Sequence, residues 1–228
     1  MKTACLLCVL AMTVSLGSSV WAQDNNGAAT KVSQATEVIQ QMTSGKAGIP
    51  DSVLAGAKCI AVIPHMIKGA FVVGGEHGSG LATCRTGSGW SAPAAFDISG
   101  GSIGWQIGGQ SSDLVMMVMN QQGMDQLMSG HFKVGAGADV AAGPVGRSGS
   151  ANAGWKAAIL TYARSKGAFA GVNVSGSAVT QNKKLTKELY GKDVPFGDIL
   201  KGQVPPPATA QAFLSAVNQA EQSASAHK

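Results

Sequence analysis

The spacing of hydrophobic and polar residues divides the chain into three zones. Between residues 30 and 43, Val32, Ala35, Ile39 and Met42 recur at helical spacing, which predicts an amphipathic helix. From Lys58 to about residue 178 the apolar residues follow the shorter periods typical of strands. Helical spacing returns after that point. Helices on both sides of a run of strands favour an α+β fold.

Glycine-containing segments punctuate the strand zone. Residues 57–63 are apolar on both faces and predict a buried strand, followed by a polar connection. Residues 70–76 and 80–86 flank His-Gly-Ser, which predicts a hairpin turn. Residues 113–119 predict a central strand, Asn120 a helix cap, and residues 166–167 the turn of a second hairpin. Glycine accounts for 31 of 228 residues, about twice the usual fraction. Because glycine lets a sheet coil, we expect a curved, glycine-rich antiparallel β-sheet or partial barrel with N-terminal and C-terminal helices.

One motif in this zone suggests catalysis. Residues 100–104, Gly-Gly-Ser-Ile-Gly, match G-x-S-x-G, the nucleophile elbow of serine hydrolases. An elbow requires a helix directly after its serine. Here large apolar residues at 103, 105 and 107 alternate with small or polar ones, which is the period of a strand. We therefore expect Ser102 to lie in a strand and predict no catalytic residue.

The first 22 residues have the pattern of a secretory signal. Lys2 precedes an apolar run over residues 4–16, and Val20 and Ala22 suit a cleavage site. We expect residues 23–29 to form a mobile leader, residues 30–205 one domain, and residues 206–228 a C-terminal helix and tail. The expected location is outside the cytoplasm, in the periplasm of a Gram-negative source and otherwise secreted.

Charge excludes some partners. Without Lys2, the 17 basic residues become 16 against 12 acidic ones, a net charge of +4. This mild excess suits weak attraction to anionic surfaces, but the chain lacks the dense basic runs of a nucleic-acid binder.

Two cysteines remain after signal removal. Cys59 and Cys84 form one even pair, and in an oxidising compartment such a pair predicts a disulfide. In a simple meander of the three predicted strands, the two residues would flank the middle strand, about 9.6 Å apart and beyond bridging range. The bond therefore requires either that the first and third strands are neighbours or that two layers meet there. The spacing does not suit a zinc site, and no metal site or cofactor is predicted.

Longer segments resemble a known family. Residues 49–120, from "IPDSVLAGAKCIAVIPHMIKG" to "SSDLVMMVMN", resemble the SYLF lipid-binding domain, and "GHFKVGAGADVAAGPVGR" and "ILTYARSKGAFAGVNVSGS" continue the match. The resemblance covers roughly residues 30–205 and identifies the chain as an exported bacterial member. It implies phospholipid binding, mainly through an amphipathic N-terminal segment with nearby basic residues. In this chain that segment is 30–46, with Lys31 and Lys46.

Further basic residues fall in predicted loops or at strand ends. Glycine-flanked turns can direct backbone N–H groups at an anion, and arginine adds a bidentate phosphate contact. The predicted lipid-binding residues are Lys31, Lys46, Lys68, Arg147, Arg164 and Lys166.

These observations predict an exported, non-enzymatic protein. It would bind phospholipid by peripheral contact between a basic, glycine-shaped surface and anionic headgroups of a membrane. One alternative is a structural or protein-interaction module of the cell envelope, with an envelope protein as partner. The third hypothesis is a serine hydrolase that uses Ser102.

Overall fold

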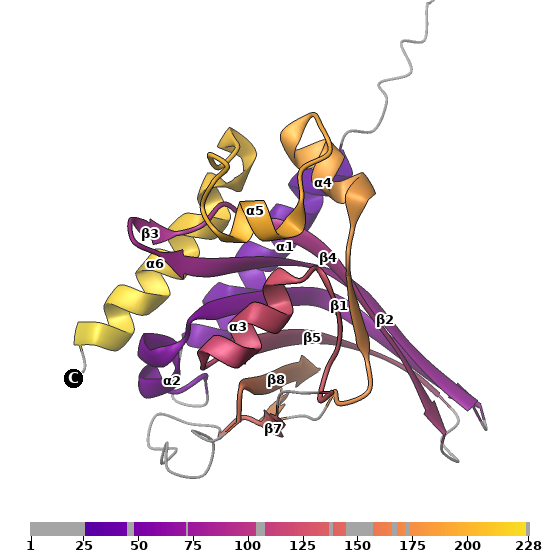
Figure 1. Ribbon diagram of the computed structural model, residues 1–228. Helices are drawn as coiled ribbons and strands as arrows, with labels where there is room; N and C mark the ends of the chain where they lie inside the picture. Colours follow the sequence, from indigo (N-terminus) through magenta and orange to yellow (C-terminus); the bar gives the residue numbers. More distant parts are fainter. Residues whose placement is uncertain are drawn as a thin grey trace, which may run out of the picture.

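A curled mixed β-sheet forms the centre of the protein, with helices at both ends of the chain (Figure 1). The computed structural model describes residues 26–44, 48–71, 73–103, 108–136, 139–144, 157–165, 168–171 and 174–226. The helices are α1 (Asn26–Thr43), α2 (Asp51–Gly56), α3 (Gln121–Met128), α4 (Lys183–Tyr190), α5 (Phe196–Leu200), the 3₁₀ helix η2 (Ala208–Ala210) and α6 (Gln211–Ala226). The strands are β1 (Cys59–Phe71), β2 (Val73–Thr86), β3 (Gly89–Trp90), β4 (Ala94–Ile103), β5 (Gly108–Val118), β6 (His131–Lys133), β7 (Val140–Ala142), β8 (Ile159–Ser165), β9 (Ala168–Gly171) and β10 (Ala178–Gln181).

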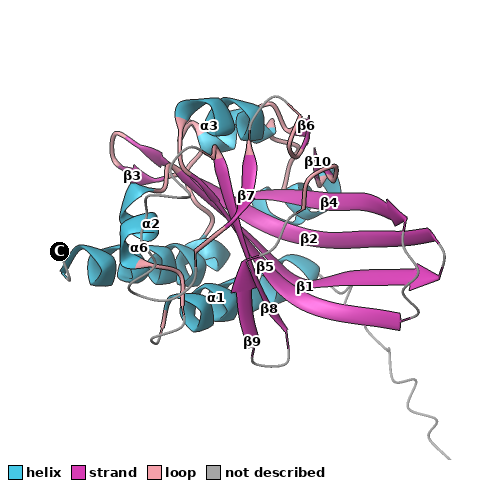
Figure 2. Cartoon of the chain, turned by 90° about the horizontal axis from the view of Figure 1, so that it is seen from below, coloured by secondary structure: helices cyan, strands magenta, loops and turns pink. Residues whose placement is uncertain are grey.

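The strand order confirms the predicted fold class. The sheet runs β6-β10-β4-β2-β1-β5-β8-β7, with β3 attached to β2 and β9 attached to β8, and it curls into a half-barrel (Figure 2). The sheet is mixed rather than wholly antiparallel, because β7 pairs with β8 in parallel. A parallel pair needs a long connection, and the chain between residues 142 and 159 provides one.

Helices cover both faces of the half-barrel. The inner face carries Ile63, Leu114 and Met116, and it packs against α3, α5 and the curled strands β6 and β10. The outer face carries Ile60, Val62 and other apolar side chains that pack against α1, α2, α4 and α6. Since the central strands are buried on both faces, they appear in the sequence as continuous apolar runs.

Helix α1 uses the predicted apolar stripe. Val32, Ala35, Ile39 and Met42 are all buried in the outer core, against the sheet and α6. The helix begins at Asn26, within the segment predicted as a leader, because Ala28 also contributes to this core.

Strand β1 contains a bulge at the point where the sequence predicted its end. The register of β1 shifts between Ile63 and Met66 relative to β5. Pro64 lies in this irregular stretch, where the ladder can accept a residue without an N–H. His65 adopts a left-handed conformation with φ of 52°, and its N–H donates to Asp113 Oδ1 at 3.0 Å. The strand then continues to Phe71.

The predicted hairpin turn at His-Gly-Ser is wrong. β2 is one strand from Val73 to Thr86, and β1 turns into it between Phe71 and Val73. The glycines of β2 accommodate the bulged neighbouring strand instead. A Cβ at Gly78 would lie 3.3 Å from Met66 Cα, and one at Gly80 would collide with the carbonyl oxygen of Val62.

The continuous hairpin explains the disulfide. Cys59 and Cys84 are register partners on adjacent strands, with their Cα atoms 4.0 Å apart, and they form the predicted bond. Of the two arrangements left open, the one with neighbouring strands is therefore correct.

Two local predictions are confirmed nearby. Asn120 caps α3 by accepting a hydrogen bond from the Gly123 N–H at 2.9 Å. Strands β8 and β9 form an antiparallel hairpin around residues 166–167, which themselves lie outside the described residues.

Candidate functional site

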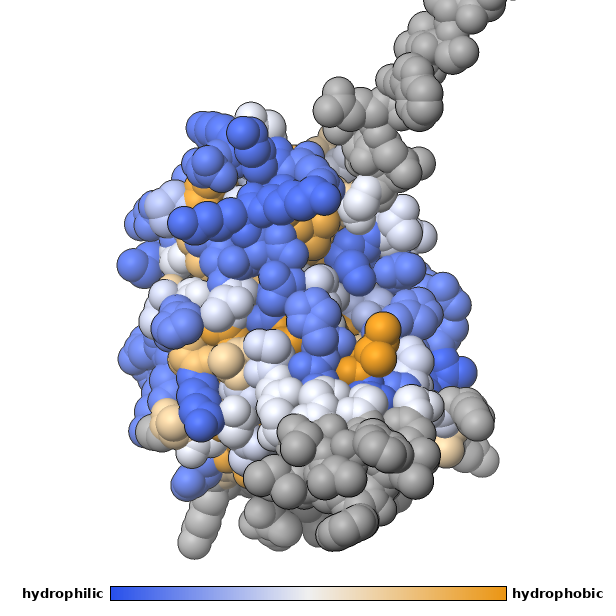
Figure 3. Space-filling model, turned by 90° about the vertical axis from the view of Figure 1, so that its right-hand side faces the viewer, coloured by the Kyte–Doolittle hydropathy of each residue, from blue (hydrophilic) through white to orange (hydrophobic). Residues whose placement is uncertain are grey.

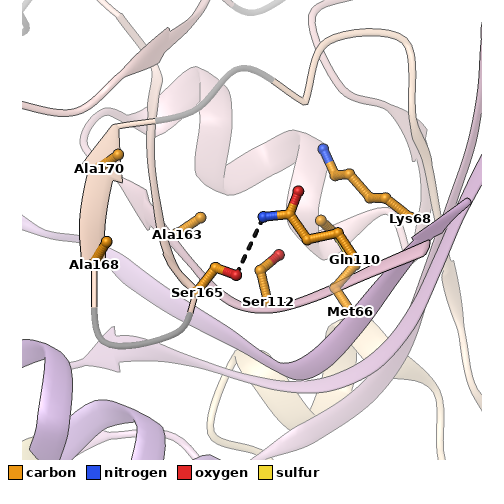
Figure 4. A pocket seen from close by; sticks show the side chains of 8 residues that line it. All are labelled: Met66, Lys68, Gln110, Ser112, Ala163, Ser165, Ala168 and Ala170. Carbon is orange, nitrogen blue, oxygen red and sulfur yellow. Dashed lines mark hydrogen bonds between the residues drawn. The ribbon is translucent and has the colours of Figure 1, made fainter. Parts of the chain in front are cut away.

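A pocket of about 480 Å³ opens on the inner face of the curled sheet (Figure 4). β1, β5, β8 and β9 each contribute two residues to its wall. Lys68 and Gln110 lie on one side and the small side chains of β9 on the other, so the curl of the sheet creates the hollow. The lining residues are Met66, Lys68, Gln110, Ser112, Ala163, Ser165, Ala168 and Ala170.

The walls of the pocket combine apolar and polar groups. Met66 is fully buried, and alanines cover the opposite side. Gln110 Nε2 donates to Ser165 Oγ at 3.2 Å, and Ser165 Oγ donates to the Ser111 carbonyl oxygen at 3.2 Å. A ligand that enters here meets hydroxyl and amide groups beside small apolar side chains, and one ammonium group.

Lys68 is held at the edge of this pocket. Its Nζ lies 2.8 Å from Glu76 Oε2, and the side chains are 39% and 14% exposed, respectively. Glu76 also accepts a hydrogen bond from Ser177 Oγ. Gly100 makes room for this contact, since a Cβ there would lie 2.7 Å from Ser177 Oγ and 2.9 Å from Glu76 Oε1. An ammonium group has three donors, so an anion can approach Lys68 while Glu76 remains bound.

The other predicted lipid-binding residues do not join Lys68. Arg164 follows Tyr162 by two positions on β8, so it lies on the outer face with that residue. Lys31 lies half-buried on α1; burial lowers its pKa, and the charge of nearby Asp97 partly opposes this effect. Lys46, Arg147 and Lys166 lie outside the described residues.

The described part of the amphipathic segment, residues 30–44, has its apolar side turned into the protein. Because the apolar face of α1 packs in the outer core, it cannot simultaneously enter a membrane in this conformation. The described part of this segment therefore has no free apolar face for the membrane contact that the family resemblance implies.

Ser102 lies in a strand, as predicted. It is the register partner of Gly74 in β2, and β4 ends one residue later. The next described element is β5, a strand that begins at Gly108, whereas a nucleophile elbow requires a helix. The rest of the alternating stretch, residues 104–107, lies outside the described residues.

Arg85 has a structural role at the opposite end of β2. Its guanidinium forms an ion pair with Glu221 of α6 and lies 4.7 Å from the centre of the Trp90 ring. Arg85 Nε donates to the Ala57 carbonyl oxygen at 2.7 Å, and Trp90 Nε1 donates to Glu221 Oε2 at 2.7 Å. These contacts join α2, β2, β3 and α6.

The described residues contain neither a cluster of metal ligands nor a membrane-spanning helix. Within that part of the chain, no three His, Cys, Asp or Glu side chains are grouped so as to hold a metal ion. The helices found there are also too short or too polar to cross a membrane.

Sequence reasoning missed most of the pocket. Gln110, Ser112 and Ser165 carry no charge and belong to no motif. Glu76 had a detectable signal: when Phe71 pairs with Val73, Lys68 and Glu76 also become register partners. That signal was hidden because the turn was predicted at His-Gly-Ser.

Comparison with known proteins gives one consistent result. The Ysc84 family model, described as "Las17-binding protein actin regulator", matches residues 99–220, more than half of the chain. The rat SH3 domain-containing YSC84-like protein 1 is 37% identical over 174 residues, which cover 75% of this chain and 51% of the rat protein. Its human counterpart is 37% identical over 167 residues, covering 72% and 48%. LAS seventeen-binding protein 3 of Saccharomyces cerevisiae is 37% identical over 172 residues, covering 72% and 37%.

The chain thus spans about half the length, or less, of these relatives. Their names describe binding or SH3-containing proteins and not enzymes. The matches confirm the resemblance found in the sequence: this chain belongs to the Ysc84 (SYLF) family.

Proposed function

We propose that this protein binds anionic phospholipid surfaces by peripheral contact, with a headgroup phosphate at Lys68. The observation that supports this proposal is the inner-face pocket, where an ammonium group stands beside hydroxyl, amide and small apolar groups. A volume of about 480 Å³ is within the range of small-molecule sites, about 300–1,000 Å³. The pocket is large enough for a phosphate with its glycerol.

The expected attachment is weak and sensitive to salt. A basic residue close to an anionic bilayer contributes about 1 kcal/mol, and this attraction decays within a Debye length. Glu76 offsets part of the charge of Lys68, so hydrogen bonding to the phosphate must supply the rest.

Vesicle sedimentation tests this function. Wild-type protein should sediment with phosphatidylglycerol-containing vesicles at low salt and be released at high salt, whereas phosphatidylcholine vesicles should retain little. Lys68→Gln should weaken binding about fivefold, the equivalent of about 1 kcal/mol. Lys201→Gln is the matched control, because Lys201 is an exposed lysine at the end of α5. Absence of binding to anionic vesicles, or equal loss in both variants, contradicts the proposal.

Export is part of the same proposal. The signal-like segment 1–22 supports it, and so does the disulfide, which persists in oxidising compartments. Expression of the full chain, followed by N-terminal sequencing of the extracytoplasmic fraction, should give a mature protein that begins at Gln23. Recovery of the uncleaved chain in the cytoplasm alone contradicts export.

Protein-partner binding is the second candidate function. It is favoured by the relatives whose names record Las17 binding. In an exported protein the partner would be a component of the cell envelope. Failure to bind anionic vesicles, together with an intact fold, would favour this function over lipid binding.

A further inference from the structure

Four strands extend beyond the helices and form a projecting part of the sheet, here called the wing (Figures 1 and 2). The wing comprises residues 67–71 of β1, 73–77 of β2, 99–103 of β4 and 108–111 of β5. Its strands lie in the order β4-β2-β1-β5. Phe71, Val73 and Ile103 are register partners at its far end.

The outer face of the wing is uncovered. Ile67 follows the inner residue Met66, so it points to the outer face, where it is 62% exposed. Among the described residues, Ile67 is the one large apolar side chain that is exposed. The next row toward the tip consists of four exposed glycines that are register partners across the four strands: Gly109, Gly69, Gly75 and Gly101.

The wing is also free of formal charge beyond its base. Its described residues beyond the base, 69–71, 73–75, 99–103 and 108–111, include no Asp, Glu, Lys or Arg, although the whole chain has a net charge of +5. Lys68 and Glu76 mark the boundary and are paired with each other. Figure 3, which views the molecule from the side of the wing, shows a small hydrophobic patch bordered by hydrophilic residues and by pale residues of intermediate hydropathy.

We propose that the wing inserts tip first into the interfacial layer of a phospholipid bilayer, with Lys68 at headgroup level. This inference rests on the proposed function and assigns the part of the protein that touches the membrane. Moving an ionised side chain out of bulk water costs far more than moving an apolar side chain or a polar one that keeps its hydrogen bonds. The apolar face of α1 is occupied in the core, so within the described residues the wing offers the free surface that fits.

The length of the wing fits insertion into the interfacial layer with Lys68 at headgroup level. Phe71 lies three residues beyond Lys68, about 10 Å along a strand at 3.3–3.4 Å per residue. Amphipathic elements at an interface bury about 5–10 Å into the headgroup and acyl boundary.

The unpaired edges of the wing limit how deeply it can insert. β10 pairs with β4 only as far as Ser99, and β8 pairs with β5 only from Asp113. Residues 100–103 and 108–112 therefore have an edge without a strand partner in the described structure. Unpaired backbone groups require water or headgroups, which the interfacial layer provides and the hydrocarbon core does not.

A fluorescent probe tests the orientation. Gly69→Cys places a label in the wing at a position with open space around it, and Ser215→Cys places one on the exposed side of α6. In both variants Cys5 and Cys8 are replaced by serine, so that with the Cys59–Cys84 bond intact the introduced thiol is the one that reacts with the dye. Each full-length protein is labelled with a polarity-sensitive dye and mixed with phosphatidylglycerol–phosphatidylcholine vesicles. The label at 69 should shift to shorter wavelength and be quenched by nitroxide lipids, whereas the label at 215 should not respond.

A matched charge substitution provides a second measurement. Ile67→Asp should lower vesicle partitioning about tenfold, because it replaces an apolar side chain with a charge at the membrane boundary. Ser215→Asp makes the same change in net charge away from the wing and should have little effect, and Ile67→Leu should bind like wild type.

The two proposals fail in different ways. If the protein sediments with anionic vesicles but the label at 69 remains in water and Ile67→Asp binds normally, the wing is not the contact and the proposed function stands. If wild-type protein does not sediment, both proposals are overturned.

Discussion

Gly80→Ala should destabilise the protein strongly, because β2 passes close to the bulge of β1 at this point. A Cβ at residue 80 would overlap the Val62 carbonyl oxygen and lie 3.0 Å from both Ile63 Cγ1 and Phe96 Cζ. The overlapped atom belongs to the backbone of a central strand, so a side-chain rotation cannot relieve it.

The size of the effect follows from two opposing terms. Overpacking a core by one carbon costs about 1–3 kcal/mol, and the backbone contact places this case near 3. Replacing glycine restricts the unfolded chain, which returns about 0.4–1 kcal/mol. The net loss is therefore about 2 kcal/mol, or about 4–8 °C in Tm for a chain of this size.

Gly69→Ala is the matched control, because a Cβ there meets nothing within 4 Å. Urea unfolding followed by circular dichroism should place this variant at or slightly above wild-type stability, with an unchanged m-value. If the two alanine variants unfold within about 0.5 kcal/mol of each other, the close approach of β2 to the bulge is not what requires glycine.

Three further predictions concern a disulfide, an ion-paired carboxylate and a helix cap that stabilise the fold. Replacing both Cys59 and Cys84 with alanine should cost about 3.5 kcal/mol, from the chain entropy of a loop with a sequence separation of 25; a loss below about 1 kcal/mol in urea unfolding would argue against this account. For Glu221, burial raises the pKa, but hydrogen bonds from Arg85 and Trp90 and the charge of Arg85 lower it overall below its usual 4.5. The stabilisation from the Glu221 carboxylate is thus present above pH 4.5 and is lost as pH falls below it, so the stability difference between wild type and Glu221→Gln should shrink in acid; a constant difference contradicts this assignment. Asn120→Ala should cost about 1 kcal/mol because the Gly123 N–H loses its cap, and unchanged stability in the same assay would show that the cap contributes nothing.

The sequence predicted the layers of this protein better than its turns. Periodicity located the buried stripe of α1 and the central strand β5, because burial on one or two faces has a direct signature in residue spacing. Pro64 and the glycines at 78 and 80 were interpreted as ends and turns. Glycine marks a close approach as readily as a turn, and only the position of the neighbouring strand distinguishes the two.

The candidate site was predictable only in part. Lys68 was identified as a basic residue at a strand end, and the structure places it in the pocket. Charge alone could not show that Arg164 faces the other side of the sheet, since this depends on where β8 lies and on its parity. The neutral residues Gln110 and Ser165 acquire significance only when the curl of the sheet brings β5 and β9 to the same hollow.

The hairpin of β1 and β2 connects two regions of different character. At one end Cys59 and Cys84 join the strands covalently between layers of helices, and at the other the same strands project freely. Mechanically this is a cantilever, clamped at its base and free at its tip. The disulfide and packing on both faces resist a change of register in the clamped half, whereas the outer face of the projecting half has no such support. A displacement of the projecting half therefore leaves the packed interior in place.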